Sequence, residues 1–141
     1  MAVNLTGPMR LTRAVLPGTV AVKKGAIVNI SSEVGLLGSC AGVAYTSSKH
    51  ALIGMTLTKA FMYGPAGIMV NAVAPGAVQT SIEAPFKSAL AGERLGKLFP
   101  VIVMGAAQPE QLASLILFLA SDAASNVNGV VLSCDGGWSA I

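Results

Sequence analysis

The sequence YTSSK at residues 45–49 places a phenol four positions ahead of an ammonium. Residues four apart on a helix are neighbours on one face, so Tyr45 and Lys49 can act as a pair. An ammonium near a phenol stabilises the phenolate and makes the hydroxyl usable as an acid or a base near neutrality. The pair therefore indicates proton transfer to or from a substrate oxygen. Alone it is weak evidence, because Tyr-x-x-x-Lys occurs by chance in many helices.

Two serines, Ser31 and Ser32, close the apolar run that precedes this helix. In open α/β sheets, ligands bind at the carboxyl ends of the strands. A hydroxyl there could hold the substrate oxygen beside Tyr45. The same groups also suit ester hydrolysis, with Ser32 as a nucleophile activated by Tyr45 and Lys49. Against hydrolysis, the sequence has no Gly-x-Ser-x-Gly elbow.

Three short apolar runs opened by glycine predict strands that are covered on both faces, as in a parallel sheet. They are KKGAIVNISS (23–32), GIMVNAVAPG (67–76) and GVVLSCDGG (129–137). Residues 44–63 and 108–121 predict the crossover helices between them. The expected stripe of the first helix is Tyr45, Lys49, Ile53, Leu57 and Phe61. The second begins with Pro109 and Glu110, and its expected core face is Leu112, Leu115, Ile116 and Leu119.

The remaining segments are less regular. Residues 1–18 predict a helix with Leu5, Met9 and Leu16 inward, ended by Pro17-Gly18. Residues 77–107 have no clean period, and a connection of that length more often acts as a lid or binding segment. We assign 77–107 as a substrate-loop or lid segment. The apolar residues of this segment suggest a hydrophobic or bulky ligand. These residues are Ile82, Phe86, Leu90, Leu95 and Phe99.

These elements predict an α/β fold in one domain spanning 1–141. It is a partial, Rossmann-like doubly wound layer of three parallel strands with helical crossovers. The strand at 26–32 forms an apolar edge in such a sheet, and a stable protein must pair or cover that edge. We expect another chain, or an absent amino-terminal half, to cover it.

Composition narrows the function classes. Apolar residues make up 53% of the chain and charged residues 11%, which favours burial of surface in a homo-oligomer. No apolar stretch reaches the roughly 20 residues of a membrane span, and the amino terminus lacks a secretion signal, so we expect a cytoplasmic protein. The scattered basic residues do not indicate nucleic-acid binding. Cys40 and Cys134 lack zinc-ligand spacing, so no metal is expected, and His50, the one histidine, lies near no acid.

The ordered motifs resemble those of the short-chain dehydrogenases/reductases over essentially the whole chain. VNLTG supplies Asn4, VNISS supplies Ser32, and YTSSK supplies Tyr45 and Lys49, in the order of the family's catalytic tetrad. VNAVAPGAVQT resembles the segment that contacts the nicotinamide, and GVVLSCDGG resembles the carboxyl-terminal strand. The resemblance implies hydride transfer between NAD or NADP and a small-molecule carbonyl or alcohol substrate.

The resemblance also implies a role for each matched residue. Tyr45 would exchange a proton with the substrate oxygen, which Ser32 would hold. Lys49 would make the phenol more acidic and bond the nicotinamide ribose, with Tyr45 beside it in the cofactor site. Asn4 would help to hold a water that relays protons to Lys49. The nicotinamide site would be lined by Pro75, Gly76, Val78 and Thr80.

Part of the family pattern is missing. No Gly-x-x-x-Gly-x-Gly follows an amino-terminal strand, so the resemblance starts near the tetrad asparagine and Met1 looks like an internal methionine of a longer ancestor. Losing pyrophosphate recognition removes several kcal/mol, roughly thousands-fold in affinity. We therefore expect weak cofactor binding by this chain alone. Met62 and Met69 replace charged residues that are common in the family. Beside hydride transfer and ester hydrolysis, a third alternative is that the chain is an inactive oligomeric remnant.

Overall fold

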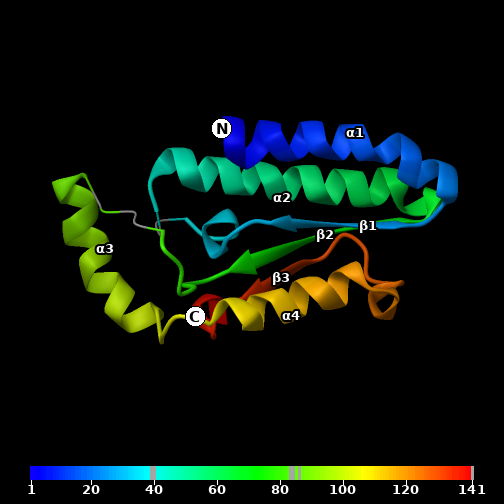
Figure 1. The fold of residues 1–141 in the computed structure, drawn as a ribbon. Helices are drawn as coiled ribbons and strands as arrows, with labels where there is room; N and C mark the ends of the chain where they lie inside the picture. The colour runs from blue at the N-terminus through cyan, green and yellow to red at the C-terminus, as the bar shows by residue number, and fades with distance from the viewer. Residues whose placement is uncertain (39–40, 83–84, 86, 141) are drawn as a thin grey trace.

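The computed structural model describes residues 1–38, 41–82, 85 and 87–140. Within them, parallel strands β1 (Gly25–Ile30), β2 (Ile68–Pro75) and β3 (Val131–Cys134) form one sheet in the order β1-β2-β3. Helices α1 (Gly7–Val22) and α2 (Val43–Tyr63) cover one face of the sheet, and α4 (Pro109–Ala120) covers the other (Figure 1). The predicted three-stranded, doubly wound layer is confirmed.

The middle strand β2 lies in the core because helices cover both of its faces. Toward α1 and α2, Ile68 and Val70 pack with Ala60. Toward α4, Val73 packs with Leu119 and Ala124, and the other predicted core residues of α4 surround them. Met69 and Val73 pair with Ala26 and Ile30 of β1, so the register is fixed along the whole of the shorter strand.

Helix α2 has the predicted length but a different buried face. The side chains of Leu57 and Phe61, which belong to the expected stripe, are exposed, with Phe61 at 82%. The buried residues are instead Ser48, Leu52, Ile53, Thr56 and Ala60. Small side chains let the helix approach the sheet closely, and the buried hydroxyl of Thr56 is satisfied by the carbonyl of Leu52 at 2.8 Å. The predicted stripe was wrong at Leu57 and Phe61 because its spacing of four residues drifts around a helix that has 3.6 residues per turn.

Helix α1 continues past the expected stop at Pro17-Gly18 and ends at Val22. Pro17 removes one helical hydrogen bond, a cost of about 3 kcal/mol. Burial of Leu16, and packing of Val20 against the β2 core, offset that cost. The helix ends where Lys23 adopts a left-handed conformation with φ 53°. Met9, expected to point inward, is 52% exposed. A five-residue π-helix, η1 (Ala2–Thr6), precedes α1.

Residues 77–107, which show no clean period in the sequence, contain helix α3 (Ala89–Ile102). Ser88 caps it, accepting a hydrogen bond from the N–H of Ala91 at 3.3 Å. Leu95 and Ile102, two turns apart, are its buried residues, and Ile102 packs with Val34 and Trp138. This small core ties α3 to the carboxyl ends of the strands (Figure 1). Phe86, part of the predicted apolar set, lies outside the described residues.

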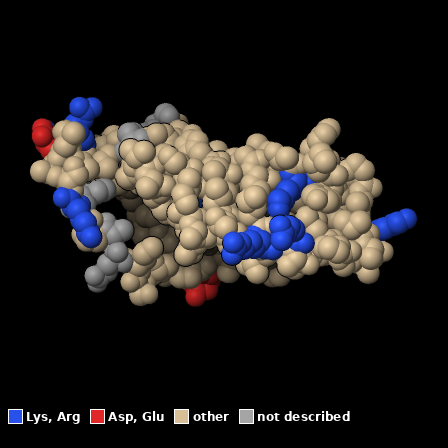
Figure 2. Space-filling view, turned by 90° about the horizontal axis from the view of Figure 1, so that it is seen from above, with Lys and Arg blue, Asp and Glu red and all other residues tan. Residues whose placement is uncertain are grey.

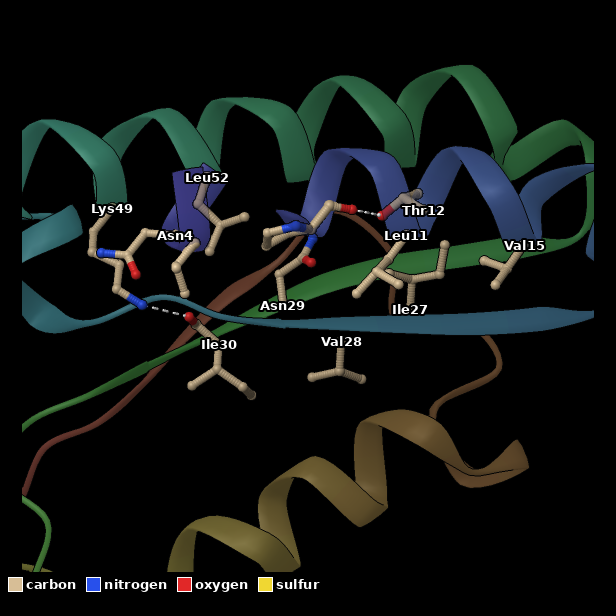
Figure 3. A pocket seen from close by; sticks show the side chains of 12 residues that line it. Asn4, Leu11, Thr12, Val15, Ile27, Val28, Asn29, Ile30, Lys49 and Leu52 are labelled. Atoms are coloured by element: carbon tan, nitrogen blue, oxygen red, sulfur yellow. Dashed lines mark hydrogen bonds between the residues drawn. The ribbon is translucent and has the colours of Figure 1, made fainter. Parts of the chain in front are cut away.

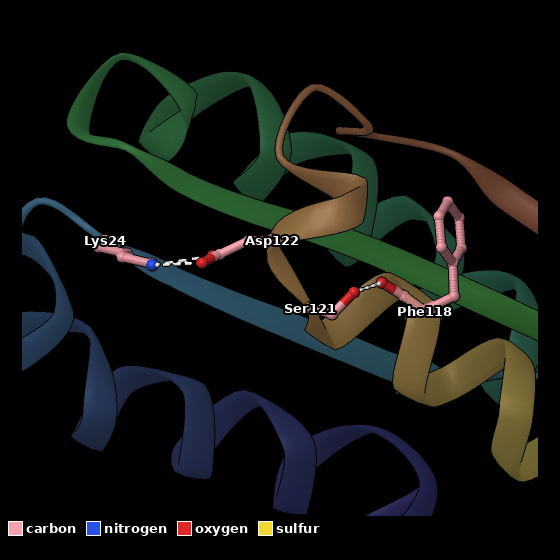
Figure 4. Close-up of polar contacts among 4 residues, drawn as sticks. All are labelled: Lys24, Phe118, Ser121 and Asp122. Atoms are coloured by element: carbon pink, nitrogen blue, oxygen red, sulfur yellow. Dashed lines mark hydrogen bonds and ion pairs between the residues drawn. The ribbon is translucent and has the colours of Figure 1, made fainter.

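At the opposite end of the sheet, Lys24 and Asp122 form an ion pair with an N–O distance of 2.8 Å (Figure 4). Asp122 opens η4 (Asp122–Ala124), which follows the end of α4, where the Ser121 hydroxyl donates to the carbonyl of Phe118. Both charged side chains are largely exposed, so the pair contributes at most about 1 kcal/mol. The ion pair lies at the end of the sheet opposite the carboxyl ends of the strands.

The described part of the chain lacks two features. No helix there is long and apolar enough to cross a membrane. No group of three or more His, Cys, Asp or Glu side chains in that part is placed to hold a metal ion.

Candidate active site

Tyr45 and Lys49 lie in the first two turns of α2, on the same face as predicted. The Lys49 Nζ atom is 5.6 Å from the centroid of the Tyr45 ring. The Tyr45 side chain is 42% exposed, so the ring is open to solvent while its neighbour is half buried. An ammonium in contact with an accessible phenol is the arrangement that the chemistry requires.

Lys49 joins α2 to the end of β1. Its Nζ donates to the carbonyl of Ile30 at 2.9 Å (Figure 3). The hydroxyl of Ser31 donates to the backbone carbonyl of Lys49 at 3.1 Å. Burial lowers the pKa of Lys49, because desolvation disfavours the charged form. The ammonium is thereby held in a fixed place and gives up a proton more readily than an exposed lysine.

Asn4 reaches α2 from η1. Its Nδ2 donates to the Ser48 hydroxyl at 3.1 Å, and that hydroxyl donates to the backbone carbonyl of Tyr45 at 2.7 Å. Asn4 and Lys49 also line one groove (Figure 3). The structure therefore brings Asn4 to the tetrad helix through Ser48. The predicted water relay from Asn4 to Lys49 stays a prediction.

Ser32 lies at the turn between β1 and η2 (Glu33–Gly35). Its hydroxyl accepts a long hydrogen bond, 3.4 Å, from the N–H of Val34. Because the hydroxyl acts as an acceptor there, its own proton stays available for a substrate oxygen. Gly35 makes this turn possible, since a Cβ there would lie 2.6 Å from the Ser31 hydroxyl oxygen and 3.1 Å from the Lys49 carbonyl carbon.

The predicted nicotinamide-lining residues follow β2 at its carboxyl end. Gly76 donates its N–H to the carbonyl of Cys134 at 3.1 Å, and a Cβ on Gly76 would lie 2.8 Å from the Cα of Asp135. Val78 forms an isolated parallel bridge with Ala107. Thr80 accepts a hydrogen bond from the N–H of Ile82 at 3.3 Å. With Pro75, these residues lie on one connected turn, and their contact with a cofactor stays a prediction.

Sequence reasoning missed the residues that support the tetrad. Ser48 links Asn4 to Tyr45, and Ser31 fastens the end of β1 to Lys49. Deeper in the sheet, the amide of Asn29 donates to the Thr56 hydroxyl at 2.9 Å. Ser48 lies within a helix, Asn29 within a strand and Ser31 just after that strand, and buried polar groups need partners. The sequence shows these polar residues, but it does not show which groups they bond.

Glu33, next to Ser32, is an unusual buried acid. Its side chain is 0% exposed, and among the described residues neither carboxylate oxygen has a hydrogen-bond partner. Burial raises the pKa of Glu33 and the charge of Asp135 adds to the rise, while the nearby hydroxyls of Ser133 and Ser139 offset it in part without reaching hydrogen-bonding geometry. A protonated carboxyl is the form that such surroundings favour.

We expect Glu33→Gln to flatten the pH dependence of stability. The folded chain holds the Glu33 proton more tightly than the unfolded chain, whose glutamates titrate at about 4.3. Stability is therefore greatest below that value and falls as the pH rises through the raised folded pKa of Glu33. Thermal unfolding can be followed from about pH 4 to about pH 8 by the fluorescence of Trp138, the one tryptophan.

The matched control is Glu93→Gln, because Glu93 is exposed on α3. This variant should show the wild-type decrease in melting temperature with rising pH. The same decrease in Glu33→Gln would contradict the assignment of the pH dependence to the buried acid.

Comparison with known proteins places this geometry in a family. A family model described as enoyl-(acyl carrier protein) reductase matches residues 1–139. A short-chain dehydrogenase/reductase of Penicillium canescens is 41% identical over 151 residues, which cover 100% of this chain and 58% of the relative. The chain belongs to the short-chain dehydrogenase/reductase family. A second relative, asnovolin H dehydrogenase of Aspergillus novofumigatus, is 38% identical, over 100% of this chain and 59% of its own length.

Solved structures of two dehydrogenases have a similar fold. A 4-hydroxyisoleucine dehydrogenase complexed with NADH matches with a TM-score of 0.81 at 34% identity, over 99% of this chain and 57% of that one. A gluconate 5-dehydrogenase from Burkholderia cenocepacia, in complex with NADP and tartrate, matches with a TM-score of 0.85 at 30% identity, over 100% of this chain and 55% of that one. The chain thus spans less than two thirds of the length of these proteins.

Proposed function

We propose that this chain carries the catalytic portion of a nicotinamide-dependent oxidoreductase that acts on a carbonyl or an alcohol. The observation that supports this most directly is the accessible Tyr45 phenol with the Lys49 ammonium 5.6 Å from its ring. Both residues lie on a helix that is fastened to the carboxyl end of β1, the side of an open sheet where ligands bind.

Each residue of the tetrad has a separate role. Tyr45 donates a proton to a carbonyl oxygen, or accepts one from an alcohol, and Ser32 holds that oxygen with its hydroxyl. Lys49 stabilises the phenolate form by its positive charge. Asn4 fixes the first turns of α2 through Ser48 and takes part in a water-mediated path by which Lys49 regains its proton.

The donors at the site suit the nicotinamide half of NAD or NADP. The Lys49 ammonium has three N–H donors, and the Ile30 carbonyl takes one, which leaves donors for ribose hydroxyls. Pro75, Gly76, Val78 and Thr80 line the ring side of this site. A bound cofactor supplies or accepts the hydride. The sequence contains no glycine-rich turn for the pyrophosphate, so we assign only the nicotinamide half to this chain.

The substrate we propose is a small molecule with an apolar or bulky body. Residues 77–107 act as the lid segment, with α3 as its rigid part. The helix and the residues after it expose large apolar side chains, namely Leu90, Val101 and Met104. Such side chains in a segment joined to the ends of the strands favour apolar ligands.

We also propose that the chain acts in the cytoplasm as a homo-oligomer. The face formed by α1 and α2 is mostly uncharged, apart from a group of basic side chains (Figure 2). Phe61 and Met62 of α2 are exposed, and large apolar side chains at the surface suit a contact between subunits.

Titration of the purified chain with NADH and with NADPH tests the cofactor proposal. We expect saturable binding with a dissociation constant of roughly 1 mM, because the pyrophosphate contacts are lacking. Lys49→Ala should weaken binding by about tenfold or more, since a hydrogen bond to a charged group is worth about 1.5–3 kcal/mol. Lys59→Ala, at the other end of α2, should bind as the wild type does. If binding does not saturate at millimolar cofactor, this chain is not a dehydrogenase by itself.

The relatives named above are dehydrogenases, and they lend no support to ester hydrolysis by Ser32. A p-nitrophenyl ester assay separates the two chemistries. We expect the wild type and Ser32→Ala to release nitrophenol at the same background rate, and a large loss in the variant would favour the hydrolase.

A further inference from the structure

The Glu33 side chain connects the Ser32 turn to the far strand of the sheet. Glu33 follows Ser32 directly and begins η2, just after the end of β1. Its carboxyl group lies near the hydroxyls of Ser133 in β3 and Ser139 in η5. Because β2 separates β1 from β3, this side chain links two strands that do not pair with each other. Ser32 is thereby joined to the carboxyl-terminal segment of the chain.

The turn that carries Ser32 is tightly packed on its other sides. On the α2 side, Gly35 leaves no room for even a single added carbon. On the other side, Val34 packs with Ile102 of α3 and with Trp138. Close-packed interiors transmit strain, because they hold few voids that could absorb it. A shift of the neighbouring carboxyl group is therefore passed on to the serine.

The two protonation states of Glu33 place opposite demands on this packing. The side chain is 0% exposed, and neither oxygen has a hydrogen-bond partner among the described residues. A neutral carboxyl group can stay in such a place, whereas a carboxylate without donors is costly there. Asp135 adds repulsion, because the N–H groups of Gly137 and Ser139 donate to it at 2.9 Å and 2.6 Å and favour its ionised form. Ionisation therefore favours a shift of the Glu33 side chain toward water.

The other charged side chains around the turn do not oppose this shift. From α2, the Lys49 ammonium donates to the Ile30 carbonyl. From α3, the charged side chains are exposed, and they are Glu93, Arg94 and Lys97. In the described part of the chain, Asp135 is thus the charge that acts on Glu33.

We propose that Glu33 is a positioning residue for Ser32, in which the buried neutral carboxyl group holds the Ser32 turn in place and ionisation releases it. In the neutral form, the Ser32 hydroxyl stays beside the Val34 N–H and directs its own proton to a substrate oxygen. In the ionised form, the serine moves with its neighbour and that hydrogen bond is lost. The role of Ser32 toward a substrate rests on the proposed function, but the movement of the turn does not.

Amide hydrogen exchange tests the movement without any ligand. The Gly35 N–H donates to the Ser32 carbonyl at 2.8 Å. Its protection, relative to that in Glu33→Gln, should fall about tenfold or more as the pH rises through the raised pKa of Glu33. Glutamine stays neutral and has nearly the shape of the protonated acid. Glu110→Gln, which changes an exposed acid of α4, should behave as the wild type does.

The Gly67 N–H, bonded to the Gly64 carbonyl at the opposite end of the sheet, separates release of the turn from a general loss of stability. Its protection should be the same in the wild type and in Glu33→Gln at each pH. Equal protection of Gly35 in these two proteins at every pH overturns the proposal. An equal fall at Gly35 and Gly67 also overturns it, by reducing Glu33 to a residue that affects stability alone.

The rate of ketone reduction with millimolar NADH tests the consequence for Ser32. The wild-type rate divided by the Glu33→Gln rate should fall about tenfold or more between about pH 5 and about pH 8, because misplacing a group by about 1 Å can cost about 100-fold. In a Ser32→Ala background, Glu33→Gln should leave this ratio independent of pH. A ratio that is constant with Ser32 present, or that falls equally without it, contradicts the positioning role. No reduction by any of these proteins would refute the proposed function, and the exchange of Gly35 would still decide whether Glu33 controls the turn.

Discussion

Tyr45→Phe is expected to lower carbonyl reduction by about 10²- to 10⁴-fold, the range that positioned proton transfer contributes. The variant keeps the ring that Lys49 contacts and removes only the hydroxyl that exchanges the proton. Binding of NADH should change little, because the loss is confined to the transition state. The measurement is the rate of NADH or NADPH oxidation with bulky apolar ketones.

The other tyrosine of the chain provides a matched control. Tyr63 lies at the last turn of α2 and packs against the core formed by Ala60, Ile68 and Val70. Tyr63→Phe makes the same chemical change on the same helix, away from Lys49, and should keep the wild-type rate. A Tyr45→Phe rate within a factor of about three of the wild type would sink the catalytic assignment.

Asn71→Leu is expected to destabilise the chain by about 3 kcal/mol, which corresponds to a decrease in melting temperature of roughly 10 °C. Asn71 is 1% exposed in the middle of β2. Its Nδ2 donates to the carbonyl of Val127 at 2.7 Å, and its Oδ1 accepts from the N–H of Val130 at 3.1 Å. Leucine fills a similar volume but leaves both backbone groups without a partner, where desolvation makes each loss costly.

Thermal unfolding at neutral pH measures this effect. Asn126→Leu is the control, because Asn126 is exposed in the loop that Asn71 holds. It should melt within about 2 °C of the wild type, as surface substitutions usually do. A similar small shift for Asn71→Leu would show that the loop before β3 does not depend on the buried amide.

The apolar runs identified the strands and most helices because burial on both faces leaves a continuous hydrophobic signature in the chain. A glycine opens each run, and β1, β2 and β3 begin at that glycine or within two residues after it. Helix α3 escaped prediction because Pro100 and two glycines interrupt its pattern. Its buried residues, Leu95 and Ile102, face a small core formed by residues distant in the sequence.

The sequence by itself determined the parallel α/β layer and the pairing of Tyr45 with Lys49, because a helical spacing of four is a local property. Only the tertiary structure decided which face of α2 is buried, that Lys49 bonds the end of β1, and that Asn4 reaches Tyr45 through Ser48. These contacts join residues up to 44 positions apart. Their partners depend on how the elements pack together, which no local pattern records.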